Sequence, residues 1–570
     1  MIRMDLVLMA VVGIAGIVSV AAFSQRLGVA APLGLVVVGA VLSFVPGVPD
    51  VEIEPELVLT VILPPLLYSA ALSMPAQDFR RNFKAISGLA VLLVVVTTAG
   101  AGVLFHLLIP DLGWAACFAL GAVVSPTDAV AATSVGRRLG LPSRLLTVLE
   151  GEGLVNDASA LVLLRSAIAA MAGAVSLWQV AGDFFYSVVV ATVIGIVVGL
   201  VNVRIRGLFQ DAVFNTAASF ILPFVAFVPA EELGASGVLA VVVAGVVTGH
   251  LGPKYLRAAD RVTEEVNWRT VAFLLESAIF LLMGLSLEHL LDEVDEARLS
   301  TTEGLLIGLV ASAFVIAVRM FFVVPLVAVL KRDERKAAEA LPVLEQRREK
   351  IAQRFADADV PASRRAYIGR RFDRATADAD FLVTEKLGWR GGVVLAWSGM
   401  RGAITLAAAQ SLPSDTPYRA ELILIAFVVA MTTLLLQGLT LPAVIRLVKI
   451  PADDQERLRT EYGTLLAELA DAGEKELTGS SSGVDPQTVE RVRADSLIGV
   501  RDERGASSPD PDHDERREQY IRLRLLTIAA ERGALLEARA RGTYSSQTLG
   551  AAQRRLDLEE TRLQALSEQP

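Results

Sequence analysis

Long apolar runs recur along the first 450 residues of the chain. Two examples are the runs 89–109 and 188–203, and both lie near or above the roughly 20 residues that a helix needs to cross a bilayer. This pattern predicts an all-α membrane protein with about thirteen transmembrane helices. The predicted segments are 5–23, 29–46, 57–74, 86–109, 113–135, 144–173, 178–203, 211–229, 235–251, 271–291, 304–330, 388–412 and 420–448.

The loops between these segments alternate in charge. Basic residues gather in every second loop, namely at Arg26, Arg80, Arg81, Lys84, Arg137, Arg138, Arg144, Arg204, Arg206, Lys254, Arg257, Arg261, Lys331 and Arg332. The loops between them are acidic or neutral. Because Lys and Arg are enriched in cytoplasmic loops, we expect a multi-pass protein of the cell membrane with its N-terminus outside and its C-terminus in the cytoplasm.

Two polar stretches stand apart from the apolar body, which comprises 1–330 and 388–450. Residues 331–387 are expected to form a cytoplasmic helical loop, and residues 451–570 a cytoplasmic helical tail. Within the tail, the segment 479–514 is rich in Ser, Gly, Pro and Asp and is predicted to be a flexible linker. A regulatory tail is one interpretation, but in the absence of a recognisable ligand motif we favour a plain helical appendage.

Composition excludes several classes of protein. The chain is 53% hydrophobic with a mean hydropathy of +0.52, which a soluble enzyme could not hide from water. Its net charge of −9 is spread over loops and tail without a basic face, so nucleic-acid binding is not expected. The single cysteine, Cys117, lies in an apolar run and can build neither a disulfide framework nor a thiolate metal site. No phosphate loop, nucleophile triad or metal cluster is present either, so we expect a transporter without a cofactor.

The fifth predicted segment carries a charge deep in an apolar run. It reads ALGAVVSPTDAVAAT, and Pro126 comes just before Thr127 and Asp128. Proline removes a helix amide and clashes with the preceding turn, which favours a locally unwound helix. Because an intramembrane charge costs a few kcal/mol or more, such residues indicate function. Freed carbonyl groups beside an aspartate could bind a cation.

The sixth predicted segment, which reads EGEGLVNDASALVLLR, is the most polar of the set. Glu152 and Asn156 share a helix face at i,i+4 spacing, and Asp157 sits one position further round. Asn156 is expected either to orient Asp157 or to bond local backbone groups.

The twelfth predicted segment contains a second site that unwinds easily. It reads GGVVLAWSGMRGAITLAAA, in which Arg401 lies between Gly399 and Gly402. Segments five and twelve are seven apart, so a repeat of helices one to six by eight to thirteen would be inverted in the membrane. Broken helices at matching repeat positions are typical of the midplane site of a transporter.

Several of these motifs resemble one family. They are LPPLLYSAAL (63–72), SPTDAVA (125–131), EGLVNDASALVL (152–163), ESAIFLLMGL (276–285), WSGMRGAITLA (397–407) and LLLQGLTLP (434–442). Together they span nearly the whole apolar body, and it is their order that makes them specific. At these motifs the chain resembles the monovalent cation/proton antiporter-1 family, which includes the prokaryotic NhaP-type antiporters and the animal sodium/proton exchangers.

The resemblance implies a role for several residues. Asp157 would be the main carrier of ion and proton, with Thr127 and Asp128 as its partners at the unwound segment. Glu152 and Arg401 would form a charge pair. The resemblance also implies a homodimer, in which a core bundle moves against a dimerisation domain, and one-for-one, electroneutral exchange.

Two positions depart from the family pattern. Gly153 stands where many relatives have serine, and Ser69 stands where some relatives carry an acid. Both changes bear on the number of cation ligands, and therefore on the preference among Na⁺, Li⁺ and K⁺.

The residues themselves suggest how exchange would work. Alkali cations bind hard oxygen ligands, and the carboxylates of Asp128 and Asp157 can hold either a cation or a proton. Competition for one site would then couple the two ions in a secondary antiporter. The alternatives are a cation channel, which the broken helices disfavour, and a carrier of organic anions or sugars, which would need free cationic or hydrogen-bonding groups at the midplane.

Overall fold

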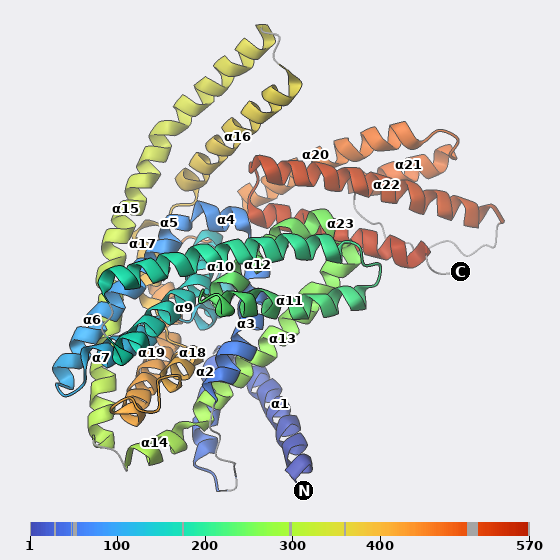
Figure 1. Ribbon diagram of the computed structural model, residues 1–570. Helices are drawn as coiled ribbons and strands as arrows, with labels where there is room; N and C mark the ends of the chain where they lie inside the picture. Colours follow the sequence, from blue (N-terminus) through green and yellow to red (C-terminus); the bar gives the residue numbers. More distant parts are fainter. Residues whose placement is uncertain are drawn as a thin grey trace.

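The computed structural model describes residues 2–27, 30–46, 48, 54–173, 176–295, 299–357, 361–498 and 511–567. Across these ranges all regular structure is helical (Figure 1). Eight of the described helices are long and apolar enough to cross a membrane. The remaining predicted segments fall on shorter apolar helices or on helices interrupted by an irregular stretch. The prediction of a multi-span helical membrane protein is therefore confirmed.

The helices of the apolar body pack most closely within two groups. Group A consists of η2 (Gly88–Leu92), α6 (Leu93–Leu108), α7 (Trp114–Val123), α8 (Ala129–Arg138), α9 (Ser143–Ala172), α15 (Thr301–Asp357), α17 (Gly388–Trp397), α18 (Ala403–Gln410) and α19 (Arg419–Val448). Within it α6 packs on α7, α7 on α9, and α15 on α19. Alanine and leucine side chains such as Ala119, Leu120 and Ala426 are fully buried there, which lets the helices approach closely.

Group B contains the remaining long helices of the body. It consists of α1 (Ile2–Leu27), α2 (Ala31–Ser43), η1 (Leu57–Ile62), α3 (Leu63–Ser73), α10 (Leu177–Arg206), α11 (Ala212–Glu232), α12 (Gly237–Tyr255) and α13 (Ala258–Leu285). Within it α10 packs on α12, α12 on α3, and α13 on α2. Short helices connect the groups: α4 (Ala76–Arg81), α5 (Phe83–Ser87) and α14 (Leu287–Asp295).

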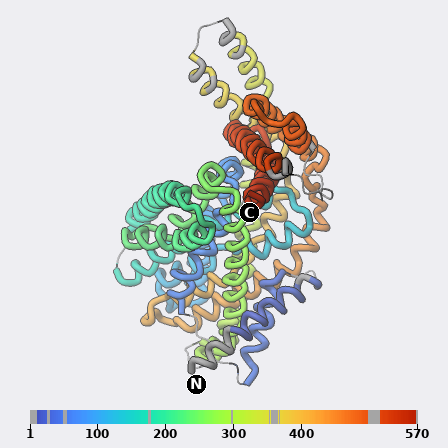
Figure 2. The backbone as a smooth tube through the Cα atoms, turned by 90° about the vertical axis from the view of Figure 1, so that its right-hand side faces the viewer, coloured from blue at the N-terminus to red at the C-terminus, as the bar shows by residue number. Residues whose placement is uncertain are grey.

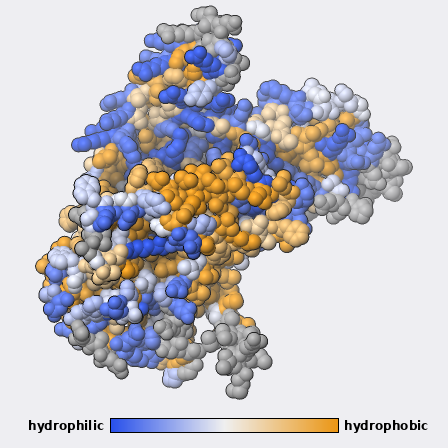
Figure 3. Space-filling model, viewed as in Figure 1, coloured by the Kyte–Doolittle hydropathy of each residue, from blue (hydrophilic) through white to orange (hydrophobic). Residues whose placement is uncertain are grey.

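The outer surface of the body is apolar where it faces away from both cores. Trp178 and Phe185 of α10 and Phe214 of α11 are 87%, 71% and 67% exposed. Figure 3 shows a broad apolar face over these helices, whereas polar residues gather around the ends of the molecule. Such a surface is stable against lipid and would aggregate in water.

Helix α15 continues from the body into the segment that the sequence assigns to a polar loop. It runs from Thr301 to Asp357, and α16 (Ala362–Thr384) returns along it. Figure 1 shows this hairpin projecting beyond the body. The boundary predicted at 330 is not a helix end, because the polar residues after it are good helix formers such as Ala, Glu, Lys and Arg.

In its described residues the tail folds into four helices, α20 (Gln455–Ser480), α21 (Pro486–Ile498), α22 (Pro511–Arg541) and α23 (Ser546–Ser567). They share a core that includes Leu465, Leu469 and Leu535. Figure 2 shows the tail seated on the body at the end from which the α15–α16 hairpin projects.

The linker predicted at 479–514 is wrong over part of its length. Residues 486–498 form α21, because Val492 is buried against Leu477 and Leu523 of the neighbouring helices. Residues 499–510 of that segment lie outside the described residues.

Candidate functional site

Two helices of group A are interrupted, and the interruptions cross. The first lies between Val123 and Ala129 and the second between Trp397 and Ala403. The backbone N–H of Asp128 donates to the carbonyl oxygen of Met400 at 2.6 Å. Both breaks expected from the sequence are therefore present, and their irregular backbones bond to each other within the body.

Gly402 makes the crossing possible. A Cβ atom at this position would collide with the carboxylate of Asp128. Asp128 in turn caps α8, because its Oδ1 accepts a hydrogen bond from the N–H of Val130 at 2.8 Å. The close approach fixes the Asp128 carboxylate at the crossing of the two breaks.

One polar face of α9 holds the first break in place. The hydroxyl of Thr127 donates to Oε1 of Glu152 at 2.7 Å. Nδ2 of Asn156 donates to the carbonyl oxygen of Thr127 at 2.6 Å and to its Oγ1 at 3.0 Å. Asn156 therefore bonds the freed backbone, which was one of the two roles expected for it. Its buried Oδ1 has no hydrogen-bond partner within the described residues.

The expected charge pair between Glu152 and Arg401 is wrong, because the structure pairs Glu152 with Arg319 of α15. Nη2 of Arg319 donates to Oε2 of Glu152 at 2.8 Å, and Nη1 forms a second bond to Oε1. The Nε of Arg319 also donates to the carbonyl oxygen of Leu395, just before the second break, at 2.9 Å. Both charged groups are almost fully buried, so each neutralises the other in a place that water does not reach.

Arg401, which is also buried, bonds to backbone carbonyl groups instead of to Glu152. Its Nε donates to the carbonyl oxygen of Val124 at 3.1 Å, and its Nη1 donates to the carbonyl oxygen of Gly399. These carbonyl groups lie at the two breaks. Arg401 therefore satisfies backbone groups that the interrupted helices leave without partners.

Asp157 lies beside this network without joining it. Its side chain is 7% exposed, and no hydrogen bond or ion pair engages its carboxylate within the described residues. It lies within electrostatic range of Asp128. That the two aspartates share one ion site stays a prediction. Glu276 of α13, which belongs to group B, also lies within electrostatic range of Asp128.

The two departures from the family pattern have local explanations. A Cβ atom at Gly153 would lie 2.7 Å from that of Ala129, the first residue of α8, so a serine there would need the helices to shift. The hydroxyl of Ser69 donates to the backbone carbonyl of Trp268 at 3.4 Å.

Comparison with known proteins agrees with the fold. The family model described as "Sodium/hydrogen exchanger, transmembrane" matches residues 10–447. An uncharacterized Na⁺/H⁺ exchanger of Mycobacterium tuberculosis is 28% identical over 562 residues, which cover 96% of this chain and 95% of that protein.

Two further comparisons cover part of the chain. A sodium, potassium, lithium and rubidium/H⁺ antiporter of Bacillus subtilis is 34% identical over 263 residues, covering 44% of this chain and 39% of that protein. The structure of the sodium proton antiporter MjNhaP1 from Methanocaldococcus jannaschii superimposes with a TM-score of 0.56 at 15% identity, covering 79% of this chain and 100% of that chain.

Proposed function

Because the chain belongs to the sodium/hydrogen exchanger family and is a transmembrane Na⁺/H⁺ antiporter, we propose that the two ions compete for Asp157. The observation that carries this proposal is the placement of the two aspartates. Asp157 is buried, and among the described residues no side chain bonds to it. It lies within electrostatic range of Asp128, which sits at the crossing of two interrupted helices. Two such carboxylates repel each other, and either a bound cation or a bound proton relieves the repulsion.

The remaining ligands for a cation come from the first break. Hard oxygen donors suit alkali ions, and the carboxylates of Asp157 and Asp128 are joined here by oxygens of Thr127 and Asn156. The hydroxyl of Thr127 is already bonded to Glu152, so it contributes mainly by holding the break open. Oδ1 of Asn156 is the more available oxygen among the described residues.

The site is built to move as one piece. Every hydrogen bond described above around the two breaks joins residues of group A, and the Glu152–Arg319 pair ties α9 to α15 within it. We propose that group A is the core bundle and moves against group B, which would form the dimerisation domain of a homodimer. Group B would then present Glu276 to the site from across the boundary.

The finer architecture follows the same proposal. Thirteen membrane crossings would form two inverted repeats whose broken helices meet at the midplane. The N-terminus would lie outside the cell, and the tail and hairpin in the cytoplasm. With Asn156 in place of a second acid next to Asp157, one proton would exchange for one cation, so that transport is electroneutral.

The test is exchange by the full-length protein in proteoliposomes with an imposed pH gradient. We expect Na⁺ to dissipate the gradient, and comparison with Li⁺, K⁺ and Cs⁺ defines the cation range. Clamping the membrane potential should leave the rate unchanged if exchange is electroneutral. Dissipation equal to that of protein-free liposomes for all four cations contradicts the proposal, and a current that scales with the Na⁺ gradient contradicts the stoichiometry.

A further inference from the structure

We infer that the C-terminal tail is a clamp that joins groups A and B at one end of the body and slows exchange while it is docked. The inference goes beyond the proposed function and rests on its movement of group A against group B. The tail is a folded unit with its own core, which includes Leu465, Leu469 and Leu535. It can therefore bind and leave the body as a whole.

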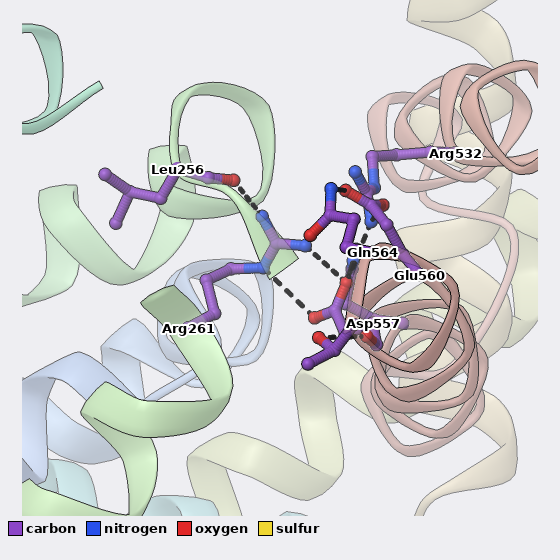
Figure 4. Close-up of polar contacts among 8 residues, drawn as sticks. Leu256, Arg261, Arg532, Asp557, Glu560 and Gln564 are labelled. Atoms are coloured by element: carbon purple, nitrogen blue, oxygen red, sulfur yellow. Dashed lines mark hydrogen bonds and ion pairs between the residues drawn. The ribbon is translucent and has the colours of Figure 1, made fainter. Parts of the chain in front are cut away.

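The tail grips group B through one buried ion pair. Arg261, in the second turn of α13, faces Asp557 of α23 across the interface (Figure 4). Nε of Arg261 donates to Oδ2 of Asp557 at 3.0 Å, and Nη2 forms a second bond to Oδ1. Their side chains are only 12% and 7% exposed. A two-pronged arginine–carboxylate contact of this kind is geometrically strict.

Asp557 is held ready for this contact from within the tail. Nε2 of Gln553 donates to its Oδ1 at 2.8 Å, and Nη2 of Arg532 donates to the same atom at 3.2 Å. α23 also packs directly on α13. The tail therefore orients the Asp557 carboxylate before docking, and the body supplies Arg261 as its partner.

The tail also grips group A, at the start of the helix that carries Asp157. The backbone N–H of Ser143, the first residue of α9, donates to Oδ2 of Asp453 at 3.1 Å. Nε2 of Gln547 in α23 donates to the same Oδ2 at 3.2 Å. Asp453 thus serves as a cap for α9 that the tail holds in position, because α9 has no capping side chain of its own.

A third contact reaches the hairpin formed by α15 and α16. Nε of Arg374 in α16 donates to the carbonyl oxygen of Ala540 at 2.6 Å. Next to it, Nη2 of Arg81 in α4 donates to the carbonyl oxygen of Gly542 at 2.8 Å, and Nε of Arg81 donates to Asp378 of α16. The last turn of α22 and the loop that follows it are therefore tied to two further parts of the body.

These contacts cannot all survive a movement of group A against group B. Hydrogen bonds tolerate shifts of only about half an ångström before they weaken steeply. A displacement of several ångströms would break either the Arg261–Asp557 contact on group B or the Asp453 cap on group A. The docked tail therefore stabilises the present arrangement of groups A and B relative to the arrangement reached after group A has moved.

The seam between tail and body also contains a cavity of about 540 Å³. Its lining includes Glu385, in the connection between α16 and α17. Burial raises the pKa of Glu385 to about 7, the charges of Asp453 and Asp78 act in the same direction, and Arg144 and Arg457 oppose them. Since the ordinary value is 4.5, docking favours the protonated form, and it should weaken as the pH rises from about 4.5 to about 7.

This pH dependence can be measured with Glu385→Gln, which mimics the protonated side chain. We expect a protease to release the tails of variant and wild type equally fast at pH 5.5, and the wild-type tail faster at pH 8. Dividing the release rate of the wild-type tail by that of the variant tail at each pH cancels the pH dependence of the protease itself. A ratio that stays constant across this range contradicts the assignment to Glu385.

The clamp itself is tested on the full-length protein in proteoliposomes with Arg261→Gln and Asp557→Asn. The first variant leaves the tail unaltered and the second leaves the body unaltered. We expect both to expose the tail to protease and to raise the Na⁺-driven exchange rate roughly 3- to 10-fold, the scale of one lost ion-pair contact in a docking equilibrium. The matched control is Asp471→Asn, an exposed tail aspartate that pairs with Lys475 of its own helix, and it should leave both readouts unchanged.

The two readouts separate the possible failures. A tail that stays protected in both variants overturns the role of the Arg261–Asp557 contact, and a released tail with an unchanged or slower exchange rate overturns the clamp. If the wild type itself exchanges no ions, it is the proposed function that fails, and protection of the tail still reports on docking.

Discussion

Replacing Asp157 by asparagine is expected to reduce Na⁺/H⁺ exchange by roughly 100-fold or more. Removing one partner of a buried charge interaction costs about 3–5 kcal/mol, and each 1.4 kcal/mol is a factor of ten in affinity. The neutral side chain can neither hold a proton in exchange for a cation nor balance the charge of Na⁺. The measurement is dissipation of a pH gradient by the variant in proteoliposomes, at saturating Na⁺ and across a range of pH.

Two further variants and a measurement of stability show whether the loss of exchange is specific to the carboxylate at this site. Asp111→Asn changes an exposed loop residue in the same chemical way and should exchange like the wild type. Asp128→Asn should also lose exchange, yet asparagine still caps a helix as well as aspartate does, so α8 should stay intact. Because Asp157 makes no hydrogen bond within the described residues, Asp157→Asn should unfold at a temperature no lower than the wild type. Exchange that survives in Asp157→Asn would remove this residue from the carrier role.

The second large effect is expected at the ion pair between Glu152 and Arg319. Arg319→Gln leaves Glu152 charged and buried without its cation, which should destabilise the protein by roughly 3–5 kcal/mol. Glu152→Gln together with Arg319→Gln removes both charges and should recover part of that loss. Thermal unfolding in detergent of the single and double variants gives the coupling between the two positions.

The same cycle tests which arginine is the partner. Residues in direct contact couple by about 0.5–3 kcal/mol, whereas more distant pairs are nearly additive. We therefore expect strong coupling between Glu152 and Arg319, and weaker coupling between Glu152 and Arg401. Equal coupling to both arginines would contradict the arrangement of bonds described for the two breaks.

Local chemistry made part of the site predictable. Pro126 cannot donate a helix hydrogen bond, and Gly399 and Gly402 flank a charge, so both breaks could be located from the sequence. Hydropathy located the helices for the same reason, because a membrane imposes their length. What these features share is that one stretch of chain determines each of them.

The partner of Glu152 could not be chosen in this way. Arg319 and Arg401 both lie deep in apolar segments, and either could have neutralised the acid. The choice depends on which helix packs against α9 and on the carbonyl groups that the breaks leave free. Arg319 was overlooked although its signal was present, since a charge in the middle of 304–330 needs a partner.

The tail shows a similar limit. Polar composition indicated a flexible linker at 479–514, yet the few apolar positions around Val492 are enough to order α21 against its neighbours. Contacts between distant segments, such as that between Arg261 and Asp557, leave no pattern along the chain at all.

The length of α15 gives the molecule a mechanical property that no single contact has. At 57 residues it measures about 85 Å, since an α-helix rises about 1.5 Å per residue. Arg319, which pairs with Glu152, lies about a third of the way along this helix, and Asp357 lies at its far end. If α15 tilts by a few degrees about its N-terminal end, its far end moves by several ångströms. The hairpin of α15 and α16 would then be displaced much more than the residues around Arg319.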